Sequence, residues 1–300
     1  MALNMAGIHR NLSALSNAST ISRTRLQPHL KATQQSSYSC RNTLSPEPFE
    51  PDSGLINKLK PKIDPNDTSR HYVFGYGSLI NHKSRLRTFS EPTVAFPVSV
   101  KGLRRSWSYR CSRRHYTAVA VKRCSDPSVK TNGVLIPINH PVNDLALLDD
   151  REKDYVRSII SLDDIEFYSE SHKQQLISPT LYGQRVVIWL YEDPTGHIST
   201  AKTHTPCIHC PIPQSYIDCM ISGCLEFGIH FAQQFVASTD GWEGTWLDDR
   251  FASDALKKYV QRREIGEVLV DETRIIVDWL LESLLPYQYA SRLRPAITDK

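Results

Sequence analysis

The stretch Phe74-Gly75-Tyr76-Gly77-Ser78-Leu79 follows directly on the aromatic run His71-Tyr72-Val73. The run is apolar enough for a buried strand, and the two glycines, two residues apart, predict a sharp turn where the strand ends. Glycines let main-chain N–H groups come close to a ligand, so such a turn suits a carboxylate or an oxyanion, with the Ser78 hydroxyl as an added donor. A tight turn without a ligand fits the same residues, and the stretch by itself leaves both interpretations open.

Short apolar and aromatic runs after this turn predict a series of strands. They lie at residues 94–100, 103–109, 117–121, 133–138 and 186–191. Within the second of them, Leu103, Trp107 and Tyr109 share one face at period two. Helices are predicted at residues 142–153, 213–237 and 271–285. Tyr216 is among the residues that give the second of these helices an apolar side. Strands first and helices later predict an α+β fold, a mixed β-barrel or sheet with flanking helices.

A charged segment, residues 148–157, reads Leu-Asp-Asp-Arg-Glu-Lys-Asp-Tyr-Val-Arg. On the predicted helix Glu152 follows Leu145 and Leu148 on the apolar side, whereas Arg151 points elsewhere. Desolvation raises the pKa of a carboxyl group toward neutrality, which makes Glu152 a candidate general base. The alternative is a solvated helix end whose charged residues pair with one another.

In this order and at this separation, the two stretches resemble the γ-glutamylcyclotransferase-like superfamily, including its glutathione-degrading ChaC-type branch. Tyr76-Gly77-Ser78-Leu79 is similar to the family's glycine–serine substrate loop, which follows the first strand. Leu148-Asp149-x-x-Glu152-x-x-Tyr155-x-Arg157 is similar to the family's catalytic segment, and Val187–Tyr191 to the strand whose final aromatic lines the pocket. The resemblance covers residues 70–195, and the variants Leu79 and Lys153 lean toward the ChaC-type branch.

The resemblance implies an enzyme that releases 5-oxoproline from a γ-glutamyl peptide or amine, with glutathione as the leading candidate. It makes Glu152 the catalytic acid/base, Tyr76, Gly77, Ser78, Leu79 and Tyr191 the substrate-binding residues, and Tyr155 and Arg157 supports of the glutamate's segment. The substrate's own α-amine attacks its γ-carbonyl in this family, so no metal and no cofactor is expected. The alternative is a protein of the same fold that binds a γ-glutamyl ligand or a partner without catalysis.

The formal net charge of +4 is concentrated near the N-terminus. Residues 1–46 hold five Lys or Arg, eight Ser and no acidic residue, which leaves 31 basic and 32 acidic residues in the rest of the chain. This composition predicts an organellar transit peptide, plastid or mitochondrial, with a disordered leader as the alternative. The protein is accordingly expected in an organelle if the leader is a transit peptide, and in the cytoplasm otherwise.

The remainder of the chain is expected to form one domain with a proline-rich approach. Residues 47–69 are interpreted as a linker, residues 70–195 as the core, and residues 196–300 as a C-terminal loop and helical extension packed on that core. No apolar run approaches the roughly eighteen residues of a membrane span, so no membrane partner is expected.

Nucleic acid is not an expected partner, because the chain beyond the leader is near neutral. Residues 92–125 nevertheless hold eight Lys or Arg and no acidic residue. We expect this basic stretch to be largely a solvated strand face, or to attract a small anionic substrate.

Two later motifs fit more than one role. Cys207-Ile-His-Cys210 is half of a structural zinc site, but a second closely spaced pair is not evident in the sequence. A loop with reduced thiols is therefore expected there, with zinc as the alternative. Residues 242–250 carry two tryptophans and several charges, and we expect them to pack over the domain, with an aromatic lid over the substrate as the alternative.

Overall fold

The computed structural model describes residues 53–89, 94–111, 115–177, 185–198, 203–250 and 271–294. The chain divides into two units, residues 1–46 and residues 47–300, and every described residue belongs to the second. The predicted transit peptide or leader therefore lies outside the described residues. Within the described ranges, no helix combines the length and apolarity needed to cross a bilayer.

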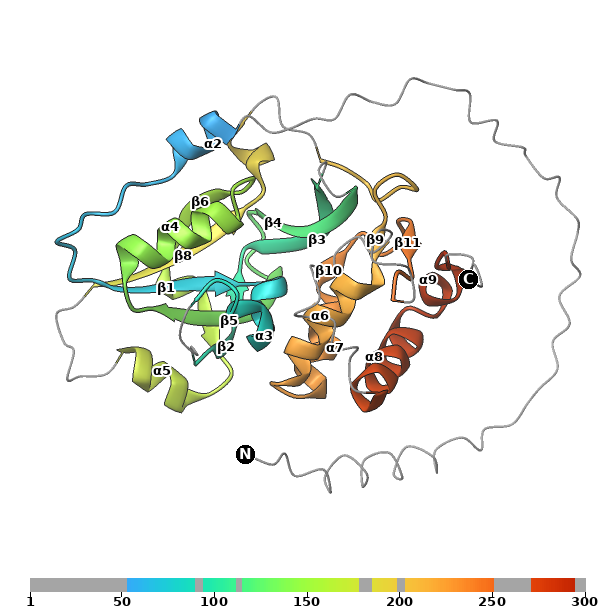
Figure 1. The fold of residues 1–300 in the computed structure, drawn as a ribbon. Coiled ribbons are helices and arrows are strands. Elements are labelled where there is room, and N and C mark those ends of the chain that lie inside the picture. The colour runs from blue at the N-terminus through green and yellow to red at the C-terminus, as the bar shows by residue number, and fades with distance from the viewer. Residues whose placement is uncertain are drawn as a thin grey trace, which may run out of the picture. The chain divides into compact units, whose positions relative to one another are not determined.

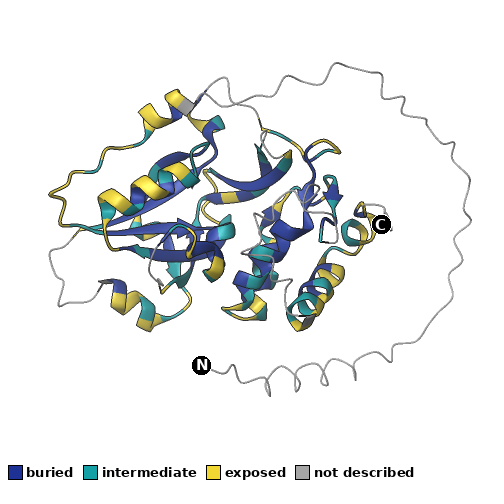
Figure 2. Ribbon diagram, in the orientation of Figure 1, coloured by how far each residue is buried: buried dark blue, intermediate teal, exposed yellow. Residues whose placement is uncertain are grey.

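A six-stranded mixed sheet in the order β6-β8-β1-β5-β2-β7 forms the centre of the fold (Figure 1). Its strands are β1 (Arg70–Gly75), β2 (Phe96–Lys101), β5 (Lys130–Ile138), β6 (Val156–Ile160), β7 (Ile165–Phe167) and β8 (Val186–Glu192). β1 runs parallel to β8 and antiparallel to β5. Figure 2 shows these three strands largely buried, as their apolar runs predict. The segment that follows β1, residues 75–81 and here called the glycine loop, thus leaves the middle of the sheet rather than an edge.

Two smaller sheets complete the β-structure. One has the order β10 (Thr239–Asp240), β3 (Leu103–Cys111) and β4 (Tyr116–Arg123), and the other pairs β9 (Ile212–Pro213) with β11 (Trp246–Leu247). Because β10 lies parallel to β3, residues beyond 196 supply a strand to a sheet that begins in the predicted core.

The prediction that Leu103, Trp107 and Tyr109 share one face is wrong. A bulge in β3 pairs Trp107 with Val119 and Tyr109 with the adjacent Ala118, so the two aromatic residues lie on opposite faces. The Trp107 ring packs against Trp242, with the ring centres 5.1 Å apart. The bulge thereby directs aromatic residues of one strand to both sides of the sheet.

Helices surround the sheets on several sides. They are α2 (Ser53–Leu59), α3 (His82–Arg85), α4 (Pro141–Arg151), α5 (Glu170–Ile177), α6 (Gln214–Leu225), α7 (Ile229–Ala237), α8 (Asp271–Leu284) and α9 (Pro286–Ser291), with 3-10 turns η1 (Ser78–Ile80), η2 (Leu162–Asp164) and η4 (Pro194–Gly196). The predicted α+β class, a mixed sheet with flanking helices, is confirmed. Across the described residues the sheets stay open and do not close into a barrel.

The long helix predicted at residues 213–237 is two helices. Gly228 separates α6 from α7 and adopts a φ of +104°, which glycine tolerates and other residues do not. The two helices contact each other and α8 (Figure 1). The helix predicted at residues 271–285 matches α8, which ends just before Pro286.

Part of the predicted linker packs on the domain. Ile56 of α2 is fully buried in a small apolar cluster with Val156 and Ile198. Burying an aliphatic side chain contributes about 1.5–3 kcal/mol. Residues 53–59 are therefore a helix of the folded unit, which their position among prolines did not indicate.

Arg105 is a fully buried cation in the middle of β3. Its six hydrogen bonds of 2.7–3.1 Å all go to neutral acceptors: the carbonyls of Tyr76, Asn132 and Phe235, the side chains of Asn132 and Thr239, and the Ser238 hydroxyl. The guanidinium carbon also lies 3.7 Å from the centre of the Phe235 ring. The basic stretch is therefore not simply a solvated face, because one of its arginines joins the core.

Gly223 lies inside α6 and lets this helix come close to the residues that follow η1. A Cβ atom at Gly223 would stand 2.6 Å from the main-chain N and Cα of Asn81. Backbone atoms move less readily than a flexible side chain, so the contact depends on the glycine.

We expect Gly223→Ala to destabilise the protein by about 1–3 kcal/mol, the usual cost of overpacking. In an uncrowded helix the same change would stabilise by about 0.5–1 kcal/mol, so the sign of the effect is diagnostic. Urea unfolding of the full chain measures it. Gly196→Ala is the control, because a Cβ there meets no described atom within 4 Å. A more stable Gly223→Ala variant would contradict the close approach of α6.

Candidate active site

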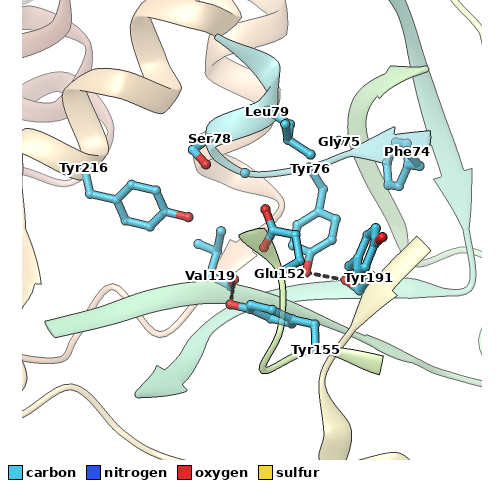
Figure 3. Close-up of a pocket in the computed structure, with 11 residues that line it drawn as sticks. Phe74, Gly75, Tyr76, Ser78, Leu79, Val119, Glu152, Tyr155, Tyr191 and Tyr216 are labelled. Carbon is cyan, nitrogen blue, oxygen red and sulfur yellow. Dashed lines mark hydrogen bonds between the residues drawn. The ribbon is translucent and has the colours of Figure 1, made fainter. Parts of the chain in front are cut away.

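A small pocket opens where the glycine loop, β4, the end of α4, β8 and α6 meet (Figure 3). Its lining residues are Phe74, Gly75, Tyr76, Gly77, Ser78, Leu79, Val119, Glu152, Tyr155, Tyr191 and Tyr216. The fold therefore brings together the predicted catalytic glutamate and all of the predicted substrate-binding residues. Arg157 is not among the residues that line the pocket.

The two glycines of the loop each allow a close approach. A Cβ atom at Gly75 would stand 2.8 Å from the Cβ of Leu79, so this glycine lets the chain fold back over the end of β1. A Cβ atom at Gly77 would stand 3.1 Å from a methyl group of Val119 and 3.2 Å from the Tyr216 hydroxyl. Because these last two residues line the pocket, the missing side chain at Gly77 leaves space inside it.

Glu152 caps the C-terminus of α4, one residue beyond the last helical residue, Arg151. Its side chain is about 20% exposed, and in Figure 3 its carboxylate lies between the glycine loop and the tyrosine rings. Burial raises the pKa of Glu152 above the ordinary value of 4.5, and the charge and hydrogen bond of Arg151 partly oppose this rise. A carboxyl group with a raised pKa accepts a proton more readily than an ordinary one.

The prediction that Arg151 points away from Glu152 is wrong. The Nε atom of Arg151 donates to a carboxylate oxygen of Glu152 at 3.1 Å, and one of its NH₂ groups donates to the Ser78 hydroxyl at 2.8 Å. The same guanidinium also bonds the hydroxyl groups of Ser84 and Thr88. Arg151 thus joins the glutamate to the glycine loop, a role that follows from the helix ending at this residue.

Four buried tyrosines form much of the pocket wall: Tyr76, Tyr155, Tyr191 and Tyr216. The Tyr76 hydroxyl donates to the main-chain carbonyl of Tyr191 at 2.6 Å, and the Tyr155 hydroxyl donates to the carbonyl of Val119 at 3.0 Å (Figure 3). Burial raises the pKa of both Tyr76 and Tyr155 well above the usual value. These hydroxyl groups are therefore neutral and bound, and they hold β8 and β4 in place around Glu152.

Asp149 holds the pocket residue Tyr191 in place from outside the pocket lining. It accepts a hydrogen bond of 2.7 Å from the Tyr191 hydroxyl and lies 3.5 Å from the guanidinium of Arg157 and 3.7 Å from the ammonium group of Lys60. Arg157 in turn donates to the carbonyl of Pro61. Its support of the site therefore runs through Asp149 rather than through Glu152.

Lys60 belongs to the segment that was predicted to be a linker. Its side chain is about 5% exposed, and its ammonium group also donates to the main-chain carbonyl of Asp149 at 3.1 Å. Burial lowers the pKa of Lys60, and the neighbouring Asp149 carboxylate partly opposes the shift. The residues before β1 thereby help to position the pocket.

Sequence reasoning also missed Tyr216 as a pocket residue. It was assigned to the apolar side of a helix, and it does lie near the start of α6, with its ring 5.8 Å from that of Trp107. Figure 3 shows its hydroxyl group pointing toward the pocket. Helical spacing predicted its burial, whereas its distance of more than 130 residues from the glycine loop hid its role.

The two later motifs of the sequence, residues 242–250 and Cys207–Cys210, do not line the pocket. Trp242 packs between Trp107 and Trp246, which supports the packing interpretation of this loop. Arg250 bonds the carboxylates of Asp218 and Asp278 and so ties α6 to α8. Among the described residues, no group of three or more His, Cys, Asp or Glu side chains is arranged to hold a metal ion.

We expect Asp149→Asn to destabilise the protein by about 1–3 kcal/mol, because the two buried cations beside it lose their carboxylate partner. The exposed neighbour Asp150 supplies the control, and Asp150→Asn is expected to change stability by less than about 0.5 kcal/mol. Urea unfolding compares the two variants. Equal stability losses would show that Asp149 does not carry this network.

No protein-family model matches the chain, and no curated protein matches it. Similar solved structures include a protein described as "Gamma-glutamyl cyclotransferase" (13% identity, 60% of this chain and 95% of that chain, TM-score 0.39). They also include a glutathione-specific γ-glutamyl cyclotransferase from yeast (15%, 58% and 98%, TM-score 0.35) and an uncharacterized protein from Homo sapiens (12%, 60% and 95%, TM-score 0.38). Two of these three proteins are described as γ-glutamyl cyclotransferases, the activity of the superfamily that the two sequence motifs resemble.

Proposed function

We propose that this chain is a γ-glutamylcyclotransferase-like enzyme, which releases 5-oxoproline from a γ-glutamyl peptide or amine, with glutathione as the leading candidate. The observation that carries the proposal is the position of Glu152. A carboxyl group with a raised pKa faces a glycine loop across a pocket walled by neutral tyrosines. These are the parts that an intramolecular aminolysis requires.

The reaction needs no nucleophile from the protein. Glu152 takes a proton from the substrate's α-ammonium group, and the freed amine attacks the γ-carbonyl carbon, where a new C–N bond closes the five-membered ring. The original γ-amide C–N bond then breaks as Glu152 returns its proton to the leaving nitrogen. The second proton that the ring nitrogen loses passes to the released amine, which departs as an ammonium ion. Holding the amine and the carbonyl together supplies much of the rate, because a positioned intramolecular attack has a high effective molarity.

The remaining groups have supporting tasks in this proposal. The Ser78 hydroxyl and the amides of residues 76–79 would hold the substrate's α-carboxylate and the developing oxyanion. Arg151 would keep the Glu152 carboxylate turned toward the loop, since it bonds both Glu152 and Ser78. Tyr191 and Tyr216 would close the sides of the pocket. No metal or organic cofactor has a task in this scheme.

Substitution of the glutamate is the most direct test. We expect Glu152→Gln to lower the rate of 5-oxoproline release from glutathione or γ-glutamyl dipeptides by about 10²–10⁴-fold, the usual size of an acid–base contribution. Chromatographic detection of 5-oxoproline measures the rate. Activity near that of the wild type in this variant would refute the assignment. Absence of product from the folded wild-type chain with every γ-glutamyl substrate would favour the alternative, a protein that binds without catalysis.

The same variant should remain folded. Folding raises the pKa of Glu152 above its unfolded value. Ionised Glu152 therefore lowers the stability of the fold at pH values above its folded pKa, and this cost disappears as the group is protonated at low pH. Glutamine carries no such cost. Urea unfolding at pH 7 is therefore expected to give Glu152→Gln a stability no lower than that of the wild type, and a large loss would mean that the ionised carboxylate holds the fold.

The pH dependence tests the role of Arg151. A general base must be deprotonated, so kcat/KM should fall on acidification, with its midpoint above pH 4.5 because burial raises the pKa of Glu152. Arg151 opposes that rise, so Arg151→Met should shift the midpoint to still higher pH. Arg87→Met is the control, since Arg87 is exposed and shares only the Ser84 contact. An unchanged midpoint in Arg151→Met would remove Arg151 from the electrostatics of the site.

A further inference from the structure

Cys207 and Cys210 face each other across a tight turn away from the pocket. The amide of Cys207 donates to the carbonyl of Cys210 at 3.2 Å, and the amide of Cys210 donates to the carbonyl of Cys207 at 3.0 Å. The two residues therefore form an isolated antiparallel bridge. Opposed residues of such a hydrogen-bonded pair have Cα atoms about 5.5 Å apart, and their side chains leave on the same face.

This geometry suits a disulfide bond. Disulfides join cysteines whose Cα atoms are about 4.4–6.8 Å apart, so the turn needs no rearrangement of its backbone to form one. No disulfide bond joins them in the structure. The bridge thus places the two Cα atoms at the separation that a disulfide needs, which a Cys-x-x-Cys spacing by itself does not ensure.

The two sulfur atoms have different surroundings. Cys207 is partly exposed beside Ile208, which is 64% exposed, whereas Cys210 is only 4% exposed. An NH₂ group of Arg110 donates to the Cys207 sulfur at 3.5 Å, and the Nε atom of Arg110 is buried without a hydrogen-bond partner among the described residues. A small molecule can therefore reach Cys207, where a cation lies beside the sulfur, but not Cys210. In a dithiol pair, the thiol that attacks an external disulfide is the accessible one beside a cation, as Cys207 is, and the thiol that then attacks the mixed disulfide can be buried, as Cys210 is.

The turn is also anchored firmly enough to keep this arrangement. The Thr117 hydroxyl donates to the carbonyl of Cys210 at 2.6 Å, and the Thr117 amide donates to the carbonyl of Pro211 at 2.9 Å. Thr117 pairs with Arg110 in the ladder of β3 and β4. One edge of this sheet therefore places both the thiol pair and its neighbouring guanidinium.

We propose that Cys207 and Cys210 form a reversible dithiol–disulfide site that reacts with small-molecule disulfides. The thiolate of Cys207 attacks one sulfur of a disulfide RSSR, which forms a mixed disulfide and releases one RS⁻. The thiolate of Cys210 then attacks the Cys207 sulfur, which closes the protein disulfide and releases the second RS⁻. In total the two protein thiols are oxidised, RSSR is reduced to two RSH, and a small thiol reverses both steps. This site is separate from the proposed catalytic pocket and does not depend on its activity.

The test uses 2-hydroxyethyl disulfide, which has no γ-glutamyl group and therefore cannot be a substrate of the proposed reaction. The folded full-length chain is equilibrated with mixtures of this disulfide and its thiol, quenched in acid, alkylated and mapped by mass spectrometry. We expect the peptide that contains Cys207 and Cys210 to lose two hydrogens and its two alkylation sites as the mixture becomes more oxidising. Excess thiol should restore both sites.

Single variants distinguish the two roles. In Cys210→Ser the mixed disulfide should accumulate at Cys207, whereas in Cys207→Ser the buried Cys210 should stay unmodified while the protein is folded. Cys219→Ser, a change in α6, is the control and should oxidise like the wild type. Urea unfolding confirms that each variant is folded.

Several outcomes would overturn the proposal. They are no loss of thiols in the folded wild type, a disulfide that maps to another pair of cysteines, or oxidation only after unfolding in urea. Stoichiometric zinc released by thiol oxidation would also overturn it, since the two cysteines would then be metal ligands.

Discussion

The buried guanidinium of Arg105 is the interaction on which the arrangement of this domain depends. Burial lowers its pKa to about 9, so it stays charged at neutral pH, yet its six hydrogen bonds all go to neutral groups. Two of the acceptors, the carbonyl of Phe235 and the hydroxyl of Ser238, lie at the C-terminus of α7, where the helix dipole favours a cation. Loss of these contacts would leave a desolvated charge and several unpaired acceptors together.

Through Arg105 the glycine loop is tied to the C-terminal part of the chain. One bond reaches the carbonyl of Tyr76 at the start of the loop, and others reach Asn132 in the central sheet. Gly223 brings α6 against the other end of the loop at Asn81. The loop is therefore fixed at both ends by residues that do not touch the pocket, which is how a short glycine-rich segment keeps one conformation.

The electrostatics of the pocket reflect a balance of burial and nearby cations. Burial alone favours the protonated form of Glu152, while Arg151 on one side and the more distant Lys60 on the other favour its carboxylate. Asp149 holds Lys60 close to the pocket, and the opposite charges of the two side chains partly offset each other. A proton acceptor needs such a balance, because a fully stabilised carboxylate would be a weak base.

The sequence predicted the parts of this structure that depend on local pattern. Alternating apolar residues located the main strands, and the resemblance of the two motifs to a known superfamily implied that Glu152 and residues 76–79 belong to one site. Long-range contacts were not predictable in this way. In the sequence Arg105 resembles its exposed neighbour Arg104, although it shares a face with Leu103 and Trp107, and a bulge cannot be read from periodicity. Tertiary contacts, which the local sequence pattern does not show, determine the positions of Arg151, Lys60 and Tyr216 at the pocket.

The wide separation of these contacts along the chain has a consequence for biosynthesis. The glycine loop and Arg105 leave the ribosome long before Tyr216, Gly223 and Phe235 have been made. Until α6 and α7 emerge, the nascent chain holds a guanidinium without several of its acceptors and a loop without its far wall. The central sheet therefore cannot reach its final packing during translation of the first two hundred residues. A chain interrupted before α7 would expose apolar surface of the kind that chaperones bind.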